Sequence, residues 1–218
     1  MASDAPMPRG AWIVGALGAI VLAAALLWHH QPRSPMASKE LLTELLGDGS
    51  PHPVGSEAGA AFAARVAEAL RDTGAAVEIQ DDMIAGPGGA PLRFINVLGR
   101  IHGTSNGPAT LLTAHHDSVA AGPGAADDGA GVVSVIEAAR KLAREGTNRD
   151  VIFLLTDGEE VGLFGAITFA LGHPWFDEVG SVVNLDARGS SGPCHIFQIG
   201  YGQRALVEIL RDSVPRPV

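Results

Sequence analysis

Cysteine and basic residues are scarce in this 218-residue sequence. The single cysteine, Cys194, excludes an intramolecular disulfide and any zinc site built from cysteines. Lys and Arg together number 15 against 24 Asp and Glu, so the formal net charge is −9. No basic patch is present that could neutralise the phosphates of a nucleic acid. We therefore expect neither a disulfide-stabilised scaffold nor a nucleic-acid partner.

The remaining composition is that of a folded domain. Hydrophobic residues make up 46% of the chain and charged residues 18%, which excludes a disordered or fibrous protein. The length is sufficient for one sizeable α/β domain with a core of its own. Metal binding can explain part of the acidic excess, because clustered carboxylates are tolerated only beside a cation or a proton.

One long uncharged run lies near the N-terminus, at residues 11–28. As a helix it would be about 27 Å long, close to the hydrocarbon thickness of a bilayer. It ends in Leu26, Leu27 and Trp28 rather than in the small residues that precede a signal-peptide cleavage site. We interpret it as an uncleaved membrane anchor, with a cleaved signal peptide as the alternative. The Lys and Arg counts on its two sides do not set its orientation.

Beyond the anchor the sequence predicts a single α/β domain. We divide the chain into a tail at 1–10, the anchor at 11–28, a proline-containing linker at 29–37 and the domain at 38–218. Helices are predicted at 39–46, 57–73, about 128–145, 162–171 and 203–212. Strands are predicted at 76–80, 92–100, from Thr110 onward, and at 151–156, 181–185 and 194–199. Because strands and helices alternate from Thr110 on, we expect a largely parallel sheet sandwiched between helices.

Acidic and imidazole side chains follow three of the apolar runs. They are His115, Asp117, Asp127, Asp128, Glu159, Glu160 and Asp186. Open α/β sheets place their chemistry at the edge where the strands end, so we expect these side chains to meet there. Imidazole and carboxylate are the usual protein ligands of Zn²⁺ when cysteine is not used. The sequence therefore predicts a metal site at this edge.

Alternation along a strand separates the two adjacent histidines. His115 and Asp117 share one face, which makes His115 the natural ligand and Asp117 the carboxylate that holds its ring. His116 points to the opposite face, where we expect a packed or hydrogen-bonded neighbour. Spacing alone does not choose between Asp127 and Asp128. We assign metal bridging to Asp127 and helix capping or support to Asp128.

Glu159 and Glu160 stand next to each other in a turn, so they are expected to differ in role. One can ligate a metal while the other acts as general base on the attacking water. A solvated charged turn is the alternative, and the position of the pair after a buried strand disfavours it. Asp186 also ends a buried run, and a turn or helix cap is its alternative.

Four motifs in this order and spacing are specific in combination. AHHDSV, PGAADDGAG, TDGEEVGLFGA and NLDARG resemble the family of two-zinc exopeptidases that includes aminopeptidase Y and bacterial leucyl aminopeptidase. PHPVGS, GPCHIFQIG and the anchor are similar to its membrane-bound branch, which includes vacuolar membrane protease and endoplasmic reticulum metallopeptidase. The resemblance covers about residues 38–201. It implies a three-layer α/β/α sandwich of phosphorylase/hydrolase type with a mostly parallel mixed sheet.

The resemblance also implies a role for each site residue. His115 and Asp186 would be ligands of one zinc ion, and Asp127 would bridge two. Glu160 would ligate the second zinc, and Glu159 would be the base that deprotonates the attacking water. The reaction would be hydrolysis of a peptide bond that releases an N-terminal residue. The protein would be a single-pass membrane protein whose peptidase domain lies on the periplasmic or lumenal side.

One family ligand has no counterpart in the sequence. The resemblance gives Asp117 the role of holding His115, which strand alternation also predicts. The family's second His ligand, however, lies farther downstream than Val218. His173 and His195 stand in other motifs. The resemblance therefore predicts a domain that is incomplete at its C-terminus and a weakened second zinc site.

Two other classes of function fit the same residues. One is another hydrolase or acyl-transfer enzyme on the same scaffold, carboxypeptidase-like or glutaminyl-cyclase-like. The other is a binding ectodomain or a catalytically impaired fragment, suggested by the missing His ligand. A donor set of Asp, Glu and His would accept Zn, Co or Mn.

Overall fold

The computed structural model describes residues 38–187, 196, 198–200 and 204–213. The predicted tail, anchor and linker, and Cys194, lie outside these residues. Among the helices within them, none combines the length and the hydropathy needed to cross a bilayer.

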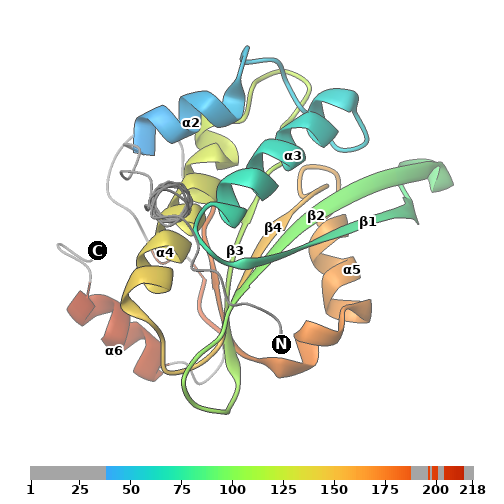
Figure 1. Cartoon of the computed structure of the whole chain (residues 1–218). Helices are drawn as coiled ribbons and strands as arrows, with labels where there is room; N and C mark the ends of the chain where they lie inside the picture. Colours follow the sequence, from blue (N-terminus) through green and yellow to red (C-terminus); the bar gives the residue numbers. More distant parts are fainter. Residues whose placement is uncertain (1–37, 188–195, 197, 201–203, 214–218) are drawn as a thin grey trace, which may run out of the picture. The chain divides into compact units, whose positions relative to one another are not determined.

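A five-stranded mixed sheet forms the centre of the described domain (Figure 1). Its strands are β1 (Ala76–Ala85), β2 (Pro91–Ile101), β3 (Ala109–His115), β4 (Val151–Thr156) and β5 (Val179–Asn184). They lie side by side in the order β1-β2-β4-β3-β5. β2 is antiparallel to both β1 and β4, whereas β3 is parallel to both β4 and β5. The α/β sheet predicted from the alternation of elements is thus confirmed. It is mixed, as the resemblance implies, because β2 alone runs against the other strands.

Helices cover both faces of this sheet. The α-helices are α2 (Ser38–Leu46), α3 (Glu57–Arg71), α4 (Ala130–Glu145), α5 (Phe164–Gly172) and α6 (Arg204–Ser213). Short helical turns are η1 (Pro87–Gly89), η2 (Ala125–Gly129) and η3 (Pro174–Glu178). α2, α3 and α4 pack together on one face, and α5 packs against β2 on the other (Figure 1).

β4 shows why the sheet is buried on both sides. Phe153 and Leu155 belong to the core beneath α3 and α4, whereas Ile152 and Leu154 belong to the core beneath α5. All four are buried, as a continuous apolar run predicts for a strand between two layers of helix. The end of β4 is therefore held firmly from both faces.

α3 begins and packs as its sequence indicates. The side chain of Ser56 caps it by accepting a hydrogen bond from the Gly59 N–H group at 2.9 Å. Phe62, Val66 and Leu70 form the fully buried stripe of this helix.

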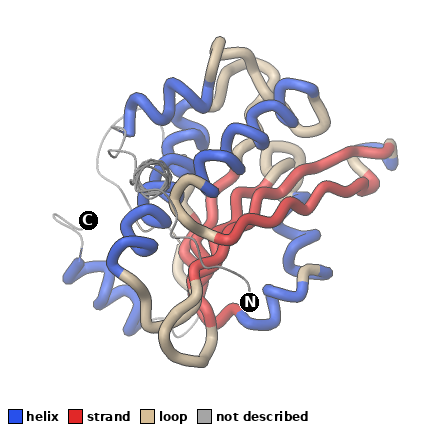
Figure 2. The backbone as a smooth tube through the Cα atoms, in the orientation of Figure 1, coloured by secondary structure: helices blue, strands red, loops and turns tan. Residues whose placement is uncertain are grey.

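Some of the predicted elements differ from the structure. The first two strands extend farther than expected and form a long hairpin that reaches beyond the rest of the sheet (Figure 2). α5 begins at Phe164 rather than residue 162, because the N–H groups of Gly162 and Leu163 bond to the Glu159 carbonyl in a tight turn. Residues 196, 198 and 199 of the strand predicted at 194–199 are not in a strand, and its other residues lie outside the described part.

Candidate metal centre

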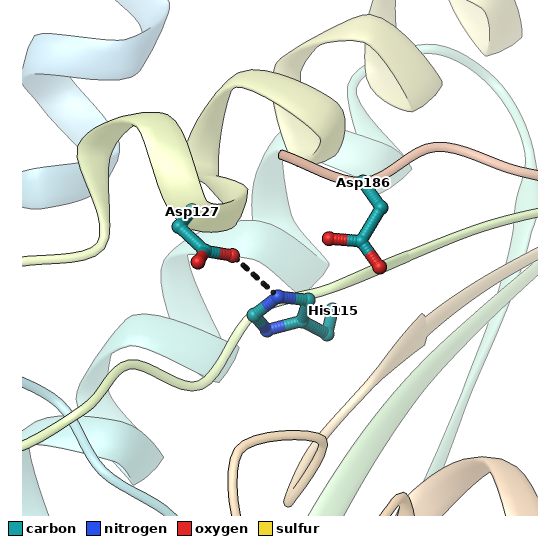
Figure 3. A group of neighbouring side chains, drawn as sticks. All are labelled: His115, Asp127 and Asp186. Atoms are coloured by element: carbon teal, nitrogen blue, oxygen red, sulfur yellow. Dashed lines mark hydrogen bonds and ion pairs between the residues drawn. The ribbon is translucent and has the colours of Figure 1, made fainter. Parts of the chain in front are cut away.

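Three side chains converge where β3 and β5 end (Figure 3). His115 is the last residue of β3, Asp127 lies in η2, and Asp186 follows β5. One ligand atom from each lies within 4.8 Å of the others. His115 is buried, whereas the two carboxylates are exposed, so the group opens toward solvent. It is the one such group of three or more found among the described residues.

The His115 ring is oriented by its neighbours on both sides. Nδ1 lies 3.1 Å from the backbone carbonyl oxygen of Asp117 and 3.4 Å from Oδ1 of the same residue. Nε2 lies 3.0 Å from Oδ1 of Asp127. Burial alone would lower the pKa of His115, but Asp117 and the nearby Asp127 and Asp128 raise it to about 10. The surrounding carboxylates therefore favour a positive charge on or beside this ring, which a proton or a metal ion can supply.

Asp127 and Asp128 point in different directions. Asp127 reaches His115 from the surface, with 59% of its side chain exposed. Asp128 is buried and its Oδ1 accepts the Gly131 N–H group at 3.1 Å, at the start of α4. Burial raises the pKa of Asp128 to about 7, against the lowering effect of His115. The sequence spacing did not choose between the two residues. In the structure Asp127 contacts His115, and Asp128 supports the start of α4.

Asp117 joins two parts of the site. Its carboxylate is buried, and it accepts the Glu159 N–H group at 3.0 Å and the Glu160 N–H group at 3.2 Å. Burial alone would raise the pKa of Asp117, but the bonds from His115 and Glu159 lower it, so the carboxylate stays charged. The strand pattern indicated the contact with His115. The link to the acidic turn was missed, because it joins segments that are 42 residues apart.

Glu159 and Glu160 are half-buried beside the converging group. Burial raises the pKa of Glu159, and Asp186 adds to this while His115 opposes it. Burial also raises the pKa of Glu160, and the negative charge of Asp127 raises it further. Both carboxyl groups therefore feel the negative potential of the site. Among the described residues, Glu160 is not brought into the group formed by His115, Asp127 and Asp186.

His116 faces away from the site, as alternation along the strand predicts. It is buried, and its Nε2 lies 2.7 Å from the backbone carbonyl oxygen of Ile95. Its ring packs against Phe62 at a centroid distance of 6.2 Å.

Asp157 is a buried polar residue that the sequence reasoning missed. Its Oδ2 accepts the Ile95 N–H group at 2.9 Å, and its own N–H group donates to Oδ1 of Asn96 at 3.0 Å. It thereby fixes the backbone between β4 and the Glu159 turn. The available signal was an Asp directly after an apolar run, which the two following glutamates obscured.

The geometry suits a divalent cation with nitrogen and oxygen ligands. A ring nitrogen and two carboxylates are three convergent donors, and catalytic zinc sites use three protein ligands and leave one position open. The hydrogen bond to the second nitrogen of His115 is the support that metal-bound histidines normally have. The residues present therefore fit a zinc ion.

Comparison with known sequences and structures gives consistent results. The sequence profile described as "Peptidase family M28" matches residues 96–218. The chain is 42% identical over 104 residues to a vacuolar membrane protease of Candida albicans, covering 47% of this chain and 12% of that protein. It is 45% identical over 92 residues to the vacuolar membrane protease of Schizosaccharomyces pombe, covering 42% of this chain and 11% of that protein. The chain thus spans only a small part of these relatives.

Two solved structures share the fold. A Zn-dependent exopeptidase from Parabacteroides distasonis superposes with a TM-score of 0.66 and 21% identity, covering 80% of this chain and 68% of that one. A glutaminyl cyclase from Porphyromonas gingivalis superposes with a TM-score of 0.63 and 23% identity, covering 74% of this chain and 62% of that one.

Proposed function

Because the chain belongs to peptidase family M28, we propose that it is a metal-dependent exopeptidase whose reaction takes place where β3 and β5 end. The observation that carries this proposal is the convergence of His115, Asp127 and Asp186 within 4.8 Å. The hydrogen-bonded attachment of the Glu159–Glu160 turn to Asp117 supports it, because a base must stand at a fixed place beside the metal.

Two zinc ions are the proposed cofactor. His115, Asp127 and Asp186 would hold one ion, and Asp127 and Glu160 would hold the second. Since Glu160 stands outside the converging group, the second ion is proposed to bind more weakly. Bound zinc supplies Lewis-acid polarisation of the scissile carbonyl group.

Proton transfer is assigned to Glu159. Its carboxylate takes a proton from the attacking water as the new C–O bond forms, and it returns that proton to the leaving amine nitrogen as the C–N bond breaks. A raised pKa suits both steps, since an effective acid–base group titrates near the working pH. Asp117 holds both the ring of His115 and the backbone of Glu159, so ligand and base keep a fixed separation.

Preference for a free N-terminus follows from the charge of the site. With only the first zinc ion bound, the carboxylates of the proposed ligands and of Glu159 carry more negative charge than the ion's two positive charges balance. An α-ammonium group would be attracted to this surplus, and a blocked N-terminus would not. The proposed substrate is therefore a peptide with a free N-terminus.

The test is a peptidase assay of the full chain on aminoacyl chromogenic substrates. Glu159→Gln keeps the size of the side chain and removes the base, so kcat should fall by about 10²–10⁴-fold. Glu145→Gln is the matched control, because Glu145 is exposed and pairs with Lys141 in α4. Equal rates for Glu159→Gln and wild type would refute the assigned base. N-acetylated substrates should be cleaved far more slowly than free ones.

Cyclisation of N-terminal glutamine is a second candidate reaction, favoured by the fold shared with a glutaminyl cyclase. Mass spectrometry of a peptide that begins with glutamine separates the two. A peptidase releases free glutamine. A cyclase leaves the peptide lighter by about 17 mass units, because ammonia is lost.

We also propose that residues 11–28 anchor the protein in a membrane, with the peptidase domain on the periplasmic or lumenal side. The uncharged run and the membrane proteases among the relatives support this. The full chain should stay with the membrane fraction after washing at alkaline pH, whereas a chain lacking residues 1–37 should be released.

A further inference from the structure

The PHPVGS segment, residues 51–56, has no part in the proposed chemistry, yet it is bonded to the centre of the site. The His52 N–H group donates to Oγ of Ser118 at 2.9 Å, and the Ser118 N–H group donates to the His52 carbonyl oxygen at 3.3 Å. Both residues are buried. Ser118 directly follows Asp117 and stands three positions after His115, so this pair of bonds fixes the end of the strand that carries the ligand.

The same two residues also touch the turn that leads to Asp127. Gly124 has a left-handed conformation with φ of 65°. A Cβ atom at this position would lie 2.9 Å from Cβ of Ser118, 2.9 Å from the backbone oxygen of Asp127 and 3.6 Å from Cε1 of His52. The turn therefore rests directly on the His52–Ser118 pair, which only glycine permits.

The ring of His52 is itself held in place. It stacks on Phe62, the buried residue at the middle of α3, at a centroid distance of 4.0 Å and an interplanar angle of 7°. Its Nδ1 lies 3.4 Å from the Ser50 carbonyl oxygen. Burial lowers the pKa of His52, which keeps the ring neutral at pH 7. The pair is thus anchored on a helix of the core rather than on a loop.

We propose that His52 and Ser118 are positioning residues for the metal centre. Together they hold the strand end bearing His115 and the turn bearing Asp127 at the separation at which both reach one ion. This proposal rests on the proposed function. Groups that support metal ligands from behind typically change metal affinity or activity by about 10–100-fold when they are removed.

Ser118→Ala tests the pair, with Thr73→Ala as the matched control. Thr73 is also a buried hydroxyl, which donates to the Leu70 carbonyl oxygen at 2.7 Å and accepts the Ala75 N–H group at 3.3 Å, at the end of α3. Ser118 likewise donates to a carbonyl oxygen, that of Val119 at 3.1 Å, and accepts one backbone N–H group. Both variants lose the same kind of bonds, but only Ser118 lies between the two ligand segments.

The measurement is titration of the metal-free full chain with Co²⁺, followed by absorption. Ser118→Ala should bind Co²⁺ about 10–100-fold more weakly than wild type, with a changed Co²⁺ spectrum and a lower kcat at similar KM. Thr73→Ala should keep the wild-type affinity and spectrum even if its Tm falls equally. Equal Co²⁺ affinity in the two variants would overturn the positioning role. Failure of the wild type to bind Co²⁺ would instead overturn the proposed function.

A second variant keeps the test decisive if Ser118→Ala does not fold. Gly124→Ala keeps both side chains of the pair and places a methyl group against Ser118 and against the backbone oxygen of Asp127. Gly88→Ala is its control, because φ at Gly88 is 71° and a Cβ atom there would meet nothing within 4 Å. Both substitutions strain the backbone, but only Gly124→Ala should weaken Co²⁺ binding. Wild-type affinity in Gly124→Ala would contradict the proposal.

Discussion

At the scale of single residues, Asp117 connects the end of β3 to the acidic turn after β4. Its carboxylate accepts two backbone N–H groups and lies 3.4 Å from Nδ1 of His115. A charged carboxylate that accepts several such bonds is strongly stabilised in its ionised form, which accounts for its lowered pKa despite burial. An amide could not replace it, because one end of an amide donates rather than accepts.

Asp117→Asn should therefore impair both the fold and the site. One buried N–H group would face the new NH₂ group, which costs about 1–3 kcal/mol in the free energy of unfolding. Activity should fall by about 10–100-fold, since the turn that bears Glu159 loses its attachment. Urea denaturation and the aminoacyl assay measure the two effects.

Asp82→Asn is the control for this substitution. Asp82 is exposed, and its side chain accepts a hydrogen bond from the neighbouring Met83 N–H group. Asp82→Asn should leave the free energy of unfolding and the activity within error of wild type. An Asp117→Asn protein as stable and as active as this control would contradict the role given to Asp117.

The residues of the site differ in how readily the sequence predicts them. His115 ends β3 and Asp186 follows β5, so strand periodicity and sheet topology suffice to bring these two together. Asp127 lies in η2, and spacing alone does not choose it over Asp128. The bonds of Ser118 to His52, and of Asp117 to the acidic turn, join segments 66 and 42 residues apart. Local patterns contain no information on such pairs, because each depends on how the helices pack onto the sheet.

At the scale of elements, the sequence predicts the bounds of β4 but not the start of α5. The continuous apolar run of β4 marks a strand buried on both faces, and its predicted bounds are confirmed. α5 is apolar nearly all round, so its sequence has no alternation of apolar and polar faces that would mark its first residue. Leu163, just before it, adopts φ of 62°, a conformation uncommon for a residue with a branched side chain. Nothing in a run of apolar letters predicts that turn.

Arg100 joins three elements at the opposite end of the sheet from the site. Its Nε donates to Oδ2 of Asp150 at 2.7 Å, and its Nη1 donates to Oε1 of Glu178 at 2.9 Å. Its guanidinium also lies over the ring of Trp175, at 5.5 Å from the centroid. The cluster ties β2 to the start of β4 and to η3.

Acid should weaken this cluster over a defined pH range. The Gly103 N–H group and then Arg100 lower the pKa of Asp150 from 3.8 to about 2, against the effect of burial. A carboxylate with a lowered pKa in the folded state stabilises it fully above pH 3.8, and this contribution is lost as the pH falls toward 2. Asp150→Asn should therefore be less stable at pH 7 and show a smaller loss of Tm between pH 4 and 2. Wild-type and variant curves that stay parallel would contradict this assignment.

At the scale of the whole molecule, the sheet brings segments distant in sequence to one edge. β5, β3 and β4 are neighbours and parallel, so their ends point the same way and deliver His115, Asp186 and the Glu159 turn together. The site is therefore part of the folded domain rather than of one loop. Binding of a cation there should stabilise the entire domain against unfolding.

Removal of metal should accordingly lower the thermal stability of the full chain. A ligand at 100 times its Kd adds about 2.7 kcal/mol to the free energy of unfolding. For a domain of this size that corresponds to about 5–10 °C in Tm. Calorimetry before and after chelation, and after zinc is restored, measures the shift. His115→Ala should show no zinc-dependent shift, and a shift equal to that of wild type would argue against this ligand.

The main-chain attachment of the Glu159–Glu160 turn has a consequence for how such a protein can change. Asp117 grips that turn only by its N–H groups, which every residue except proline possesses. These two hydrogen bonds therefore do not depend on which side chains stand at positions 159 and 160. Substitution of either glutamate by another reactive residue would therefore keep the backbone of the turn, and the new side chain would occupy the same place.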